Sequence, residues 1–179
     1  MIMAIRNINA PKKVISRIGL ILRDVIPSVA NPNRTFTEYF DSPAITADVT
    51  AGFPGETEEE FENSVNFAKE IGFAKAHVFA YSRRAGTMAY NMPNQVTKAE
   101  KSKRSHLMIK ATAETEAEFI KSHLGKTVEV LAETKDENGV CTGYTANYTP
   151  VKIPSDCDIH GITKTEITAV DGDFCIGKI

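Results

Sequence analysis

Hydrophobic and polar residues in the middle of the chain follow a strand pattern, then a helix pattern, then a strand pattern again. The extended apolar run Ile45–Ala51 predicts a strand. Apolar residues recur at helical spacing over Phe61–Ile71, and Gly72 stands where a left-handed cap would end the helix. The run Lys75–Tyr81 has β character and is followed by turn residues. A strand, a helix and a strand with short joints predict one right-handed βαβ unit.

The joint between the first strand and the helix has the sequence GFPGETEEEF, residues 52–61. Its glycines permit positive φ and close approach of a ligand, and the new helix points its free N–H groups at the same place. Thr57 and Glu60 form a capping box. Glu58–Glu60 are explained as a solvated, well-capped first turn. Glu56 precedes the cap on the ligand side, so a binding role stays open for it.

The pattern also predicts one helix before the βαβ unit and one after it. Lys12–Ile26 carries apolar residues on one face, which is typical of an amphipathic helix. A second capping box, Thr97 with Glu100, starts a helix that we expect to run to about His123.

The last part of the chain alternates apolar and polar residues in short runs separated by turn signals. The run Thr127–Leu131 is one example, and Glu137–Gly139 is one of the turns. This pattern predicts a small five-stranded barrel. The chain therefore divides into an N-terminal helix and loop of uncertain order (residues 1–44), an α/β part (45–124) and an all-β part (125–179).

Composition places few limits on function. The chain has 179 residues, 42% of them hydrophobic, and a net charge of −2, which is ordinary for a globular protein and favours no class of partner. Cys141, Cys157 and Cys175 form no CxxC pair, so neither a metal site nor a disulfide framework can be inferred from them, and buried or idle thiols in a reducing compartment are the default expectation. Since no apolar run approaches membrane-spanning length, we expect a cytoplasmic protein without a membrane partner.

Positive charge is concentrated between Tyr81 and Lys110, where the net charge is +6. Part of it crowds the first turns of the helix that begins near Thr97, where the helix dipole disfavours cations. Cations that work against their own helix indicate an external anion, and the phosphate backbone of RNA is the obvious candidate. A solvated basic face remains the alternative.

Aromatic residues in the predicted barrel suggest a second RNA contact. Tyr144, Asn147, Tyr148 and Lys152 surround one expected hairpin, and small barrels often stack bases on such aromatics. Residues 125–179 carry a net charge of about −4, so general electrostatic attraction is not available to this part alone. Alternatively, the two tyrosines are strand residues that fill a small core.

Several linked motifs resemble one family over residues 44–179. They are the run Ile45-Thr-Ala-Asp48, the turn GFPGETEEEF, the runs HVFAYSRRAGT and NMPNQ, and the stretch GYTANY with VKI. Together they resemble the C-terminal half of the radical S-adenosylmethionine methylthiotransferases, in the subfamily acting on threonylcarbamoyladenosine of tRNA. The resemblance implies the C-terminal part of a (β/α) radical SAM barrel, followed by an OB-like TRAM domain that binds RNA.

In that family, S-adenosylmethionine and two [4Fe–4S] clusters drive sulfur insertion and methylation at C2 of the modified adenosine beside the anticodon. The cluster motif CxxxCxxC is absent from this sequence. We therefore expect a fragment without catalytic or metal-binding residues, limited to binding tRNA and, as a second partner, the missing N-terminal part of the enzyme. Because a partial barrel exposes sheet edges, we expect residues 1–44 to be the least ordered part.

The resemblance also assigns site residues. On the S-adenosylmethionine side it places Asp48, Gly52, Pro54, Gly55 and Glu56. Around the mouth of the substrate site it places Tyr81, Ser82, Arg84, Gly86 and Thr87. With the charge and aromatic patterns, the predicted RNA-binding residues are Arg83, Lys98, Lys101, Lys103, Arg104, Tyr144, Asn147, Tyr148 and Lys152. The competing hypothesis is a non-catalytic protein-interaction module that completes a partner's barrel through exposed sheet edges.

Overall fold

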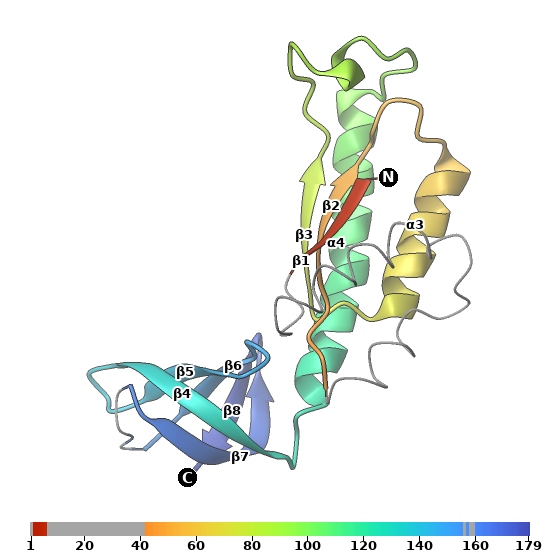
Figure 1. Ribbon diagram of the computed structural model, residues 1–179. Coiled ribbons are helices and arrows are strands. Elements are labelled where there is room, and N and C mark those ends of the chain that lie inside the picture. Colours follow the sequence, from red (N-terminus) through yellow and green to blue (C-terminus); the bar gives the residue numbers. More distant parts are fainter. Residues whose placement is uncertain (1, 7–41, 156, 158–159) are drawn as a thin grey trace, which may run out of the picture.

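The computed structural model describes residues 42–155, 157 and 160–179, and the backbone of residues 2–6. These residues form a three-stranded sheet with two helices and a closed five-stranded barrel (Figure 1). Strand β1 (Ile2–Arg6) was not indicated by the sequence pattern. The expected helix over Lys12–Ile26 lies outside the described residues. So does most of the segment 1–44, which we expected to be the least ordered part.

The predicted strand–helix–strand unit is confirmed. Strands β2 (Thr46–Ala51) and β3 (Lys75–Ala80) pair in parallel, with Thr46 opposite Lys75 and Ala51 opposite Ala80. Helix α3 (Glu58–Ile71) connects them. Strand β1 adds antiparallel to the other side of β2, so the order in the sheet is β1-β2-β3. A radical SAM barrel needs more strands than these, so this part of the chain is a partial α/β layer.

Helix α3 begins and ends where the sequence predicts. The Thr57 side chain accepts a hydrogen bond from the Glu60 N–H (3.2 Å), and the Glu60 carboxylate accepts one from the Thr57 N–H (2.8 Å). Hydrogen bonds from Thr57 lower the pKa of Glu60, because they favour its charged form. At the other end, Gly72 has φ 67° and donates to the carbonyl of Ala68 (3.2 Å). Both caps satisfy backbone groups that the helix itself leaves unpaired.

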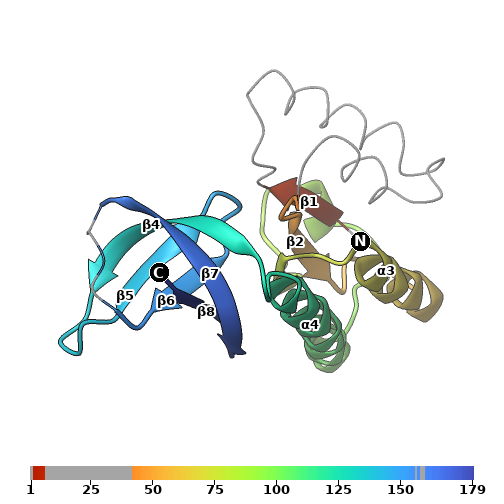
Figure 2. The same ribbon diagram turned by 90° about the horizontal axis from the view of Figure 1, so that it is seen from below.

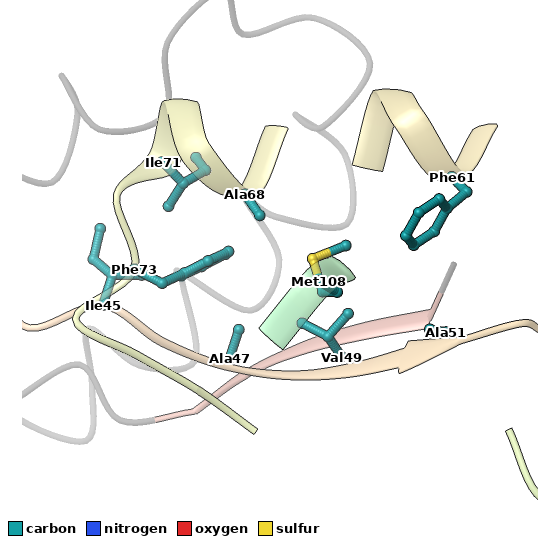
Figure 3. Packing of buried hydrophobic residues seen from close by; sticks show 9 residues of the cluster. All are labelled: Ile45, Ala47, Val49, Ala51, Phe61, Ala68, Ile71, Phe73 and Met108. Atoms are coloured by element: carbon teal, nitrogen blue, oxygen red, sulfur yellow. The ribbon is translucent and has the colours of Figure 1, made fainter. Parts of the chain in front are cut away.

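Alternation along β2 points its apolar side chains at the helices. Ala47, Val49 and Ala51 are buried, whereas the residues between them are half-buried. Figure 3 shows Val49 facing Met108 of helix α4 (Lys98–Lys121), with Phe61 of α3 nearby. Both helices lie on the same side of the sheet (Figure 2). The first hydrophobic core is therefore a single layer between sheet and helices.

The predicted five-stranded barrel is also confirmed. It contains β4 (Thr127–Lys135), β5 (Cys141–Thr145), β6 (Pro150–Ile153), β7 (Ile162–Asp171) and β8 (Phe174–Lys178), closed in the order β4-β5-β6-β8-β7. Its core includes Val130, Val151, Ile153 and Ile167. Strands β4 and β5 approach closely at Gly143, where an added Cβ would lie 2.1 Å from the carbonyl oxygen of Leu131. Only glycine fits there without moving backbone.

Helix α4 joins the two parts. A loop with the short 3-10 helix η1 (Met88–Tyr90) leads into it, and the Thr97 side chain accepts from the Glu100 N–H (3.2 Å). The expected capping box is therefore half formed, and the Glu100 carboxylate contacts Lys103 and Arg104. In its last turn, Ile120 is buried in the barrel core. Just beyond, the Gly125 N–H donates to the carbonyl of Ile167 (2.8 Å). The end of α4 therefore closes one opening of the barrel.

The cysteines correct one expectation. Cys141 on β5 forms a disulfide with Cys157, so these two residues are not idle thiols. Cys175 is free and buried in the barrel core, where burial raises the pKa of its thiol. The sequence could not indicate the pair because the tertiary fold, and not spacing along the chain, brings Cys157 in the loop after β6 next to Cys141 on β5. Among the described helices, none is long and apolar enough to cross a membrane.

The substitution Gly143→Ala should destabilise the barrel. The new methyl group would collide with backbone of β4, and overpacking of this kind costs about 1–3 kcal/mol. Thermal unfolding followed by circular dichroism measures the effect. Thr142→Ala is the matched control, because Thr142 lies next to Gly143 on the other face of β5. Equal losses in the two variants would contradict the close-approach explanation.

Candidate nucleic-acid interface

The turn between β2 and α3 is held from inside by Glu56. Gly52 and Gly55 have φ of 75° and 85°, which glycine adopts without strain. The Glu56 side chain is 2% exposed, and its carboxylate accepts hydrogen bonds from the Gly52 N–H (2.8 Å) and from Arg104 Nη1 (2.9 Å). A carboxylate in this position shapes the turn and does not face solvent. The contacts of Glu56 therefore support a structural role for this residue.

Arg104 is the centre of a buried network of carboxylates. Its side chain is 6% exposed. Besides Glu56 it contacts Glu58 (3.1 Å) and Glu100 (3.3 Å), and it donates to the backbone carbonyl of Glu56 (2.8 Å). Burial lowers the pKa of Arg104, but its hydrogen bonds to the carboxylates of Glu56 and Glu100 outweigh burial and raise the pKa overall. This placement corrects the grouping of Arg104 with the RNA-binding cations, because its donors are used inside the fold.

The network also explains why cations crowd the start of α4 against the helix dipole. The Lys103 ammonium lies 3.4 Å from a carboxylate oxygen of Glu100 and 3.7 Å from one of Glu58, so Lys103 also forms ion pairs within the fold. The external anion inferred from the sequence is not needed for Lys103 or Arg104. The argument still applies to Lys98 and Lys101, which form no ion pair with a carboxylate within the described residues.

Four cations at this end of the molecule form no ion pair with a carboxylate among the described residues, and we call them the cationic end. They are Arg83, Arg84, Lys98 and Lys101, all exposed or half-exposed. Arg83 stacks on the ring of Tyr90 (4.2 Å), and Lys101 lies 4.9 Å from the centre of the Tyr81 ring. Such cation–π contacts orient a cation without neutralising it.

The predicted cofactor-side and substrate-side residues meet at the same end of the sheet. The Gly55 N–H donates to the carbonyl of Asn94 (3.0 Å), which ties the turn to the loop after β3. The Tyr81 ring packs edge-on against Phe53, 5.2 Å between centroids. Sequence reasoning missed Phe53, although it lies inside the turn motif. Ser82 is exposed, Pro54 is buried, and Gly86 and Thr87 form a turn in which Thr87 donates to the carbonyl of Arg84. Asp48 lies further back on β2, opposite His77.

Tyr144 and Tyr148 lie on the outside of the barrel. They are 39% and 64% exposed, so the alternative that they fill a small core is wrong. Tyr148 has φ 62°, a left-handed conformation that costs a non-glycine residue on the order of 1–2 kcal/mol. Its N–H donates to the carbonyl of Thr145 (2.9 Å), so a tight turn holds it there. We call the two residues the tyrosine end.

Lys152 and Asn147 differ from a simple RNA-facing surface. The Lys152 ammonium lies over the Phe174 ring (4.2 Å) and 3.9 Å from an oxygen of Asp171. Asn147 is half-buried, and its side-chain amide donates to the carbonyl of Ser42 (3.0 Å) and lies 3.3 Å from Nε2 of His123. Asn147 is therefore a bridge between the barrel and the α/β part. Sequence reasoning missed His123, whose only signal was its position at the expected end of the second helix.

Helix α4 separates the two predicted RNA-contacting groups. The loop after β3 lies at the N-terminus of α4 and the barrel beyond its C-terminus (Figure 1). The cationic end belongs to that loop and the first turns of α4, and the tyrosine end belongs to the barrel. A helix of 24 residues is about 36 Å long at 1.5 Å per residue. The predicted RNA-binding residues are thus two surfaces and not one patch.

The cysteine set does not fit an iron–sulfur cluster. All three cysteines belong to the barrel, Cys141 and Cys157 are paired with each other, and Cys175 is buried. Such clusters require several thiolates around one site. In the part of the chain that the structure describes, no group of three or more His, Cys, Asp or Glu side chains could hold a metal ion. For S-adenosylmethionine, the predicted contacts at the turn are already engaged inside the fold, because the N–H groups of Gly52 and Gly55 donate to Glu56 and Asn94 and Lys101 packs on Gly52.

Comparisons with known proteins agree on one family. No family model matches the chain. It is 40% identical over 130 residues to the threonylcarbamoyladenosine tRNA methylthiotransferase of Bacillus subtilis (strain 168), covering 69% of this chain and 29% of the relative. The tRNA-2-methylthio-N(6)-dimethylallyladenosine synthase of Thermodesulfovibrio yellowstonii is 34% identical over 181 residues, covering 91% and 42%. The corresponding synthase of Anaplasma marginale is 38% identical over 122 residues, covering 66% and 27%.

The chain spans less than half the length of each of these relatives. The matches nevertheless cover most of the chain itself, and they agree with the linked motifs of the sequence. The chain therefore belongs to the radical S-adenosylmethionine methylthiotransferase family, whose tRNA-modifying members it matches over part of their length.

Proposed function

We propose that this chain binds tRNA and presents it for methylthiolation. The observation that carries the proposal is the cationic end, where Arg83, Arg84, Lys98 and Lys101 form no ion pair with a carboxylate within the described residues. Nearby cations that have partners in the fold, such as Arg104, are tied up in ion pairs. The contrast supports an external anion for the remaining four. The names of the relatives support tRNA as that anion.

The cationic end would contact phosphates, and the tyrosine end would contact bases. Lysine and arginine contacts to phosphate position an RNA without reading its sequence. Exposed aromatic rings stack on unpaired bases, worth about 1–3 kcal/mol per base. Tyr148 suits this role because a strained turn holds its ring outward and not in the core. The negative charge of the barrel limits its contribution to such local stacking.

No chemical step is assigned to the residues of this chain. The methylthiolation named for its relatives would need cluster thiolates, and the three cysteines here do not fit that role. When bound, S-adenosylmethionine and the clusters would supply the radical and the sulfur. The residues of this chain would contribute the orientation of the tRNA.

A second candidate function is docking of a partner's strand on β3. Strand β3 is an edge strand of the described sheet, and Phe79 on it is exposed. Unpaired edge strands are templates for pairing with another chain. If this candidate is correct, light scattering should detect dimers or larger assemblies that Phe79→Lys abolishes. A strictly monomeric chain at all concentrations would contradict it.

Reversing one charge of the cationic end should weaken tRNA binding. Lys98→Glu removes one phosphate contact, so the slope of log affinity against log salt should fall by about 1. Filter-binding titrations with a tRNA transcript over a range of salt concentrations measure it. Lys178→Glu, on the exposed face of β8, is the matched control with the same change in net charge. The proposal is wrong if binding has no salt dependence or if both variants lose the same affinity.

Arg104 should affect stability more than RNA affinity. Arg104→Met leaves the Glu56 carboxylate buried without its guanidinium, a change that costs on the order of 3–5 kcal/mol. Lys103→Met removes only exposed pairs, and its cost should be about 0–1 kcal/mol. Urea unfolding compares the two variants. Adding Glu56→Gln to Arg104→Met should restore part of the loss, because the unpaired charge is then removed, and absence of any recovery would contradict the buried pair.

A further inference from the structure

A small polar network lies where the barrel meets the α/β part. His123, one turn beyond the last buried residues of α4, is 2% exposed. Its Nε2 lies 3.3 Å from the side-chain nitrogen of Asn147 and 3.3 Å from the hydroxyl of Thr149, both in the turn between β5 and β6. Asn147 also donates to the backbone carbonyl of Ser42 (3.0 Å), just before β2. We call His123, Asn147 and Ser42 the clasp.

Hydrogen-bond partners assign the protons of the His123 ring and the orientation of the Asn147 amide. Nδ1 of His123 lies 3.0 Å from the carbonyl oxygen of Phe119, which can only accept, so Nδ1 carries the proton and Nε2 accepts. Oδ1 of Asn147 accepts from the hydroxyls of Thr145 and Thr149, which turns the amide nitrogen toward His123 and Ser42. Neutral His123 therefore accepts from the Asn147 amide, and a second proton on Nε2 would face that donor and leave only the Thr149 oxygen as an acceptor.

The clasp adds a directional contact that the burial of Ile120 in the barrel core does not supply. Ile120 fills one opening of the barrel, and an apolar plug is non-directional, so alone it would leave the barrel free to turn about the end of α4. The hydrogen bond from Asn147 reaches a different element, the segment before β2. Lys126 lies 3.5 Å from the Ser42 hydroxyl at the same junction. Contacts to both α4 and this segment determine an orientation.

We propose that the clasp fixes the orientation of the barrel on α4, so that one folded RNA contacts the cationic end and the tyrosine end together. This inference rests on the proposed function and names the partner more narrowly. An RNA that uses both surfaces must span a helix about 36 Å long. Joining two sites in a fixed geometry raises affinity by roughly 10²–10⁴-fold over one site. The ligand is therefore a long folded RNA and not a short hairpin.

The clasp also makes the junction sensitive to pH. Burial lowers the pKa of His123, and the nearby charge of Lys126 lowers it further. The barrel faces the ring with the uncharged Asn147 and Thr149, and α4 faces it with the Phe119 carbonyl and ring. Because the folded pKa lies below the unfolded value of about 6.5, the contribution of the clasp is complete above that pH and is lost as pH falls below it.

The sharpest variant is Asn147→Asp. It keeps the oxygen that accepts from Thr145 and Thr149 but loses the amide that donates to Ser42 and His123. Near pH 8 the new carboxylate would face two acceptors, so the clasp should open while the turn and Ile120 stay in place. At low pH, protonated His123 could donate to that carboxylate, so the variant should close under the conditions that loosen the unmodified chain. Asn138→Asp, in the exposed β4–β5 turn, is the control with the same change in charge.

The first measurement needs no RNA. Backbone nitrogen relaxation by NMR reports whether the barrel and the α/β part tumble as one body. We expect one correlation time for the unmodified chain and for Asn138→Asp near pH 8, and two for Asn147→Asp. The order should reverse at a pH low enough to protonate His123 in the folded chain, which a pH titration of its ring signals by NMR locates. Common tumbling of Asn147→Asp at every pH would overturn the clasp.

The second measurement compares affinity for a tRNA transcript with affinity for a short hairpin that reaches one end at a time. The unmodified chain should bind tRNA at least about 10²-fold more tightly. Asn147→Asp should lose most of that advantage, and its hairpin affinity should match that of Asn138→Asp. Equal affinities of the unmodified chain for both RNAs would overturn the bridging. If neither RNA binds, the proposed function fails, and the relaxation data alone decide the clasp.

Discussion

Helix α4 contributes buried side chains to both hydrophobic cores. Met108 packs between the sheet and α3, and Ile120, further along the same helix, fills one opening of the barrel. A helix is stiff over this length, so its two ends cannot move independently. Arg104 of α4 contacts the turn before α3, and Lys101 of α4 contacts Tyr81 at the start of the loop after β3. Ile120 of the same helix packs in the barrel core. The separation between the cationic end and the tyrosine end follows from this one element.

The charges at the start of α4 follow from what is buried beneath them. Arg104 reaches into the fold and holds the Glu56 carboxylate against the turn, while Glu58 and Glu100 answer the rest of its charge. A buried ion in a low-dielectric interior must be paired and hydrogen-bonded, and this one is. These ion pairs neutralise part of the positive charge that is concentrated in this segment of the sequence. The cations left in solvent are fewer and lie at one end of the molecule.

Local sequence signals were sufficient for the secondary structure. The capping box at Thr57 and the left-handed Gly72 bounded α3, and alternation in residues 125–179 indicated the barrel strands. These signals act over a few residues, so no tertiary information is needed. Strand β1 was not predicted, and its pairing partner β2 lies about 40 residues further along the chain. The disulfide was not predicted because sequence spacing does not show that the loop carrying Cys157 lies next to Cys141 on β5.

The sequence by itself determined the elements, the order of the α/β part and the barrel, and the family through its linked motifs. Which charged and polar residues face solvent was decided only by the tertiary structure. Arg104 and Asn147 look like surface residues in the sequence, yet one is buried among carboxylates and the other bridges two parts of the fold. Tyr148 could have filled the core, yet it lies outside. The physical reason is that the partners that bury or expose a side chain come from residues distant in sequence, and only packing brings them together.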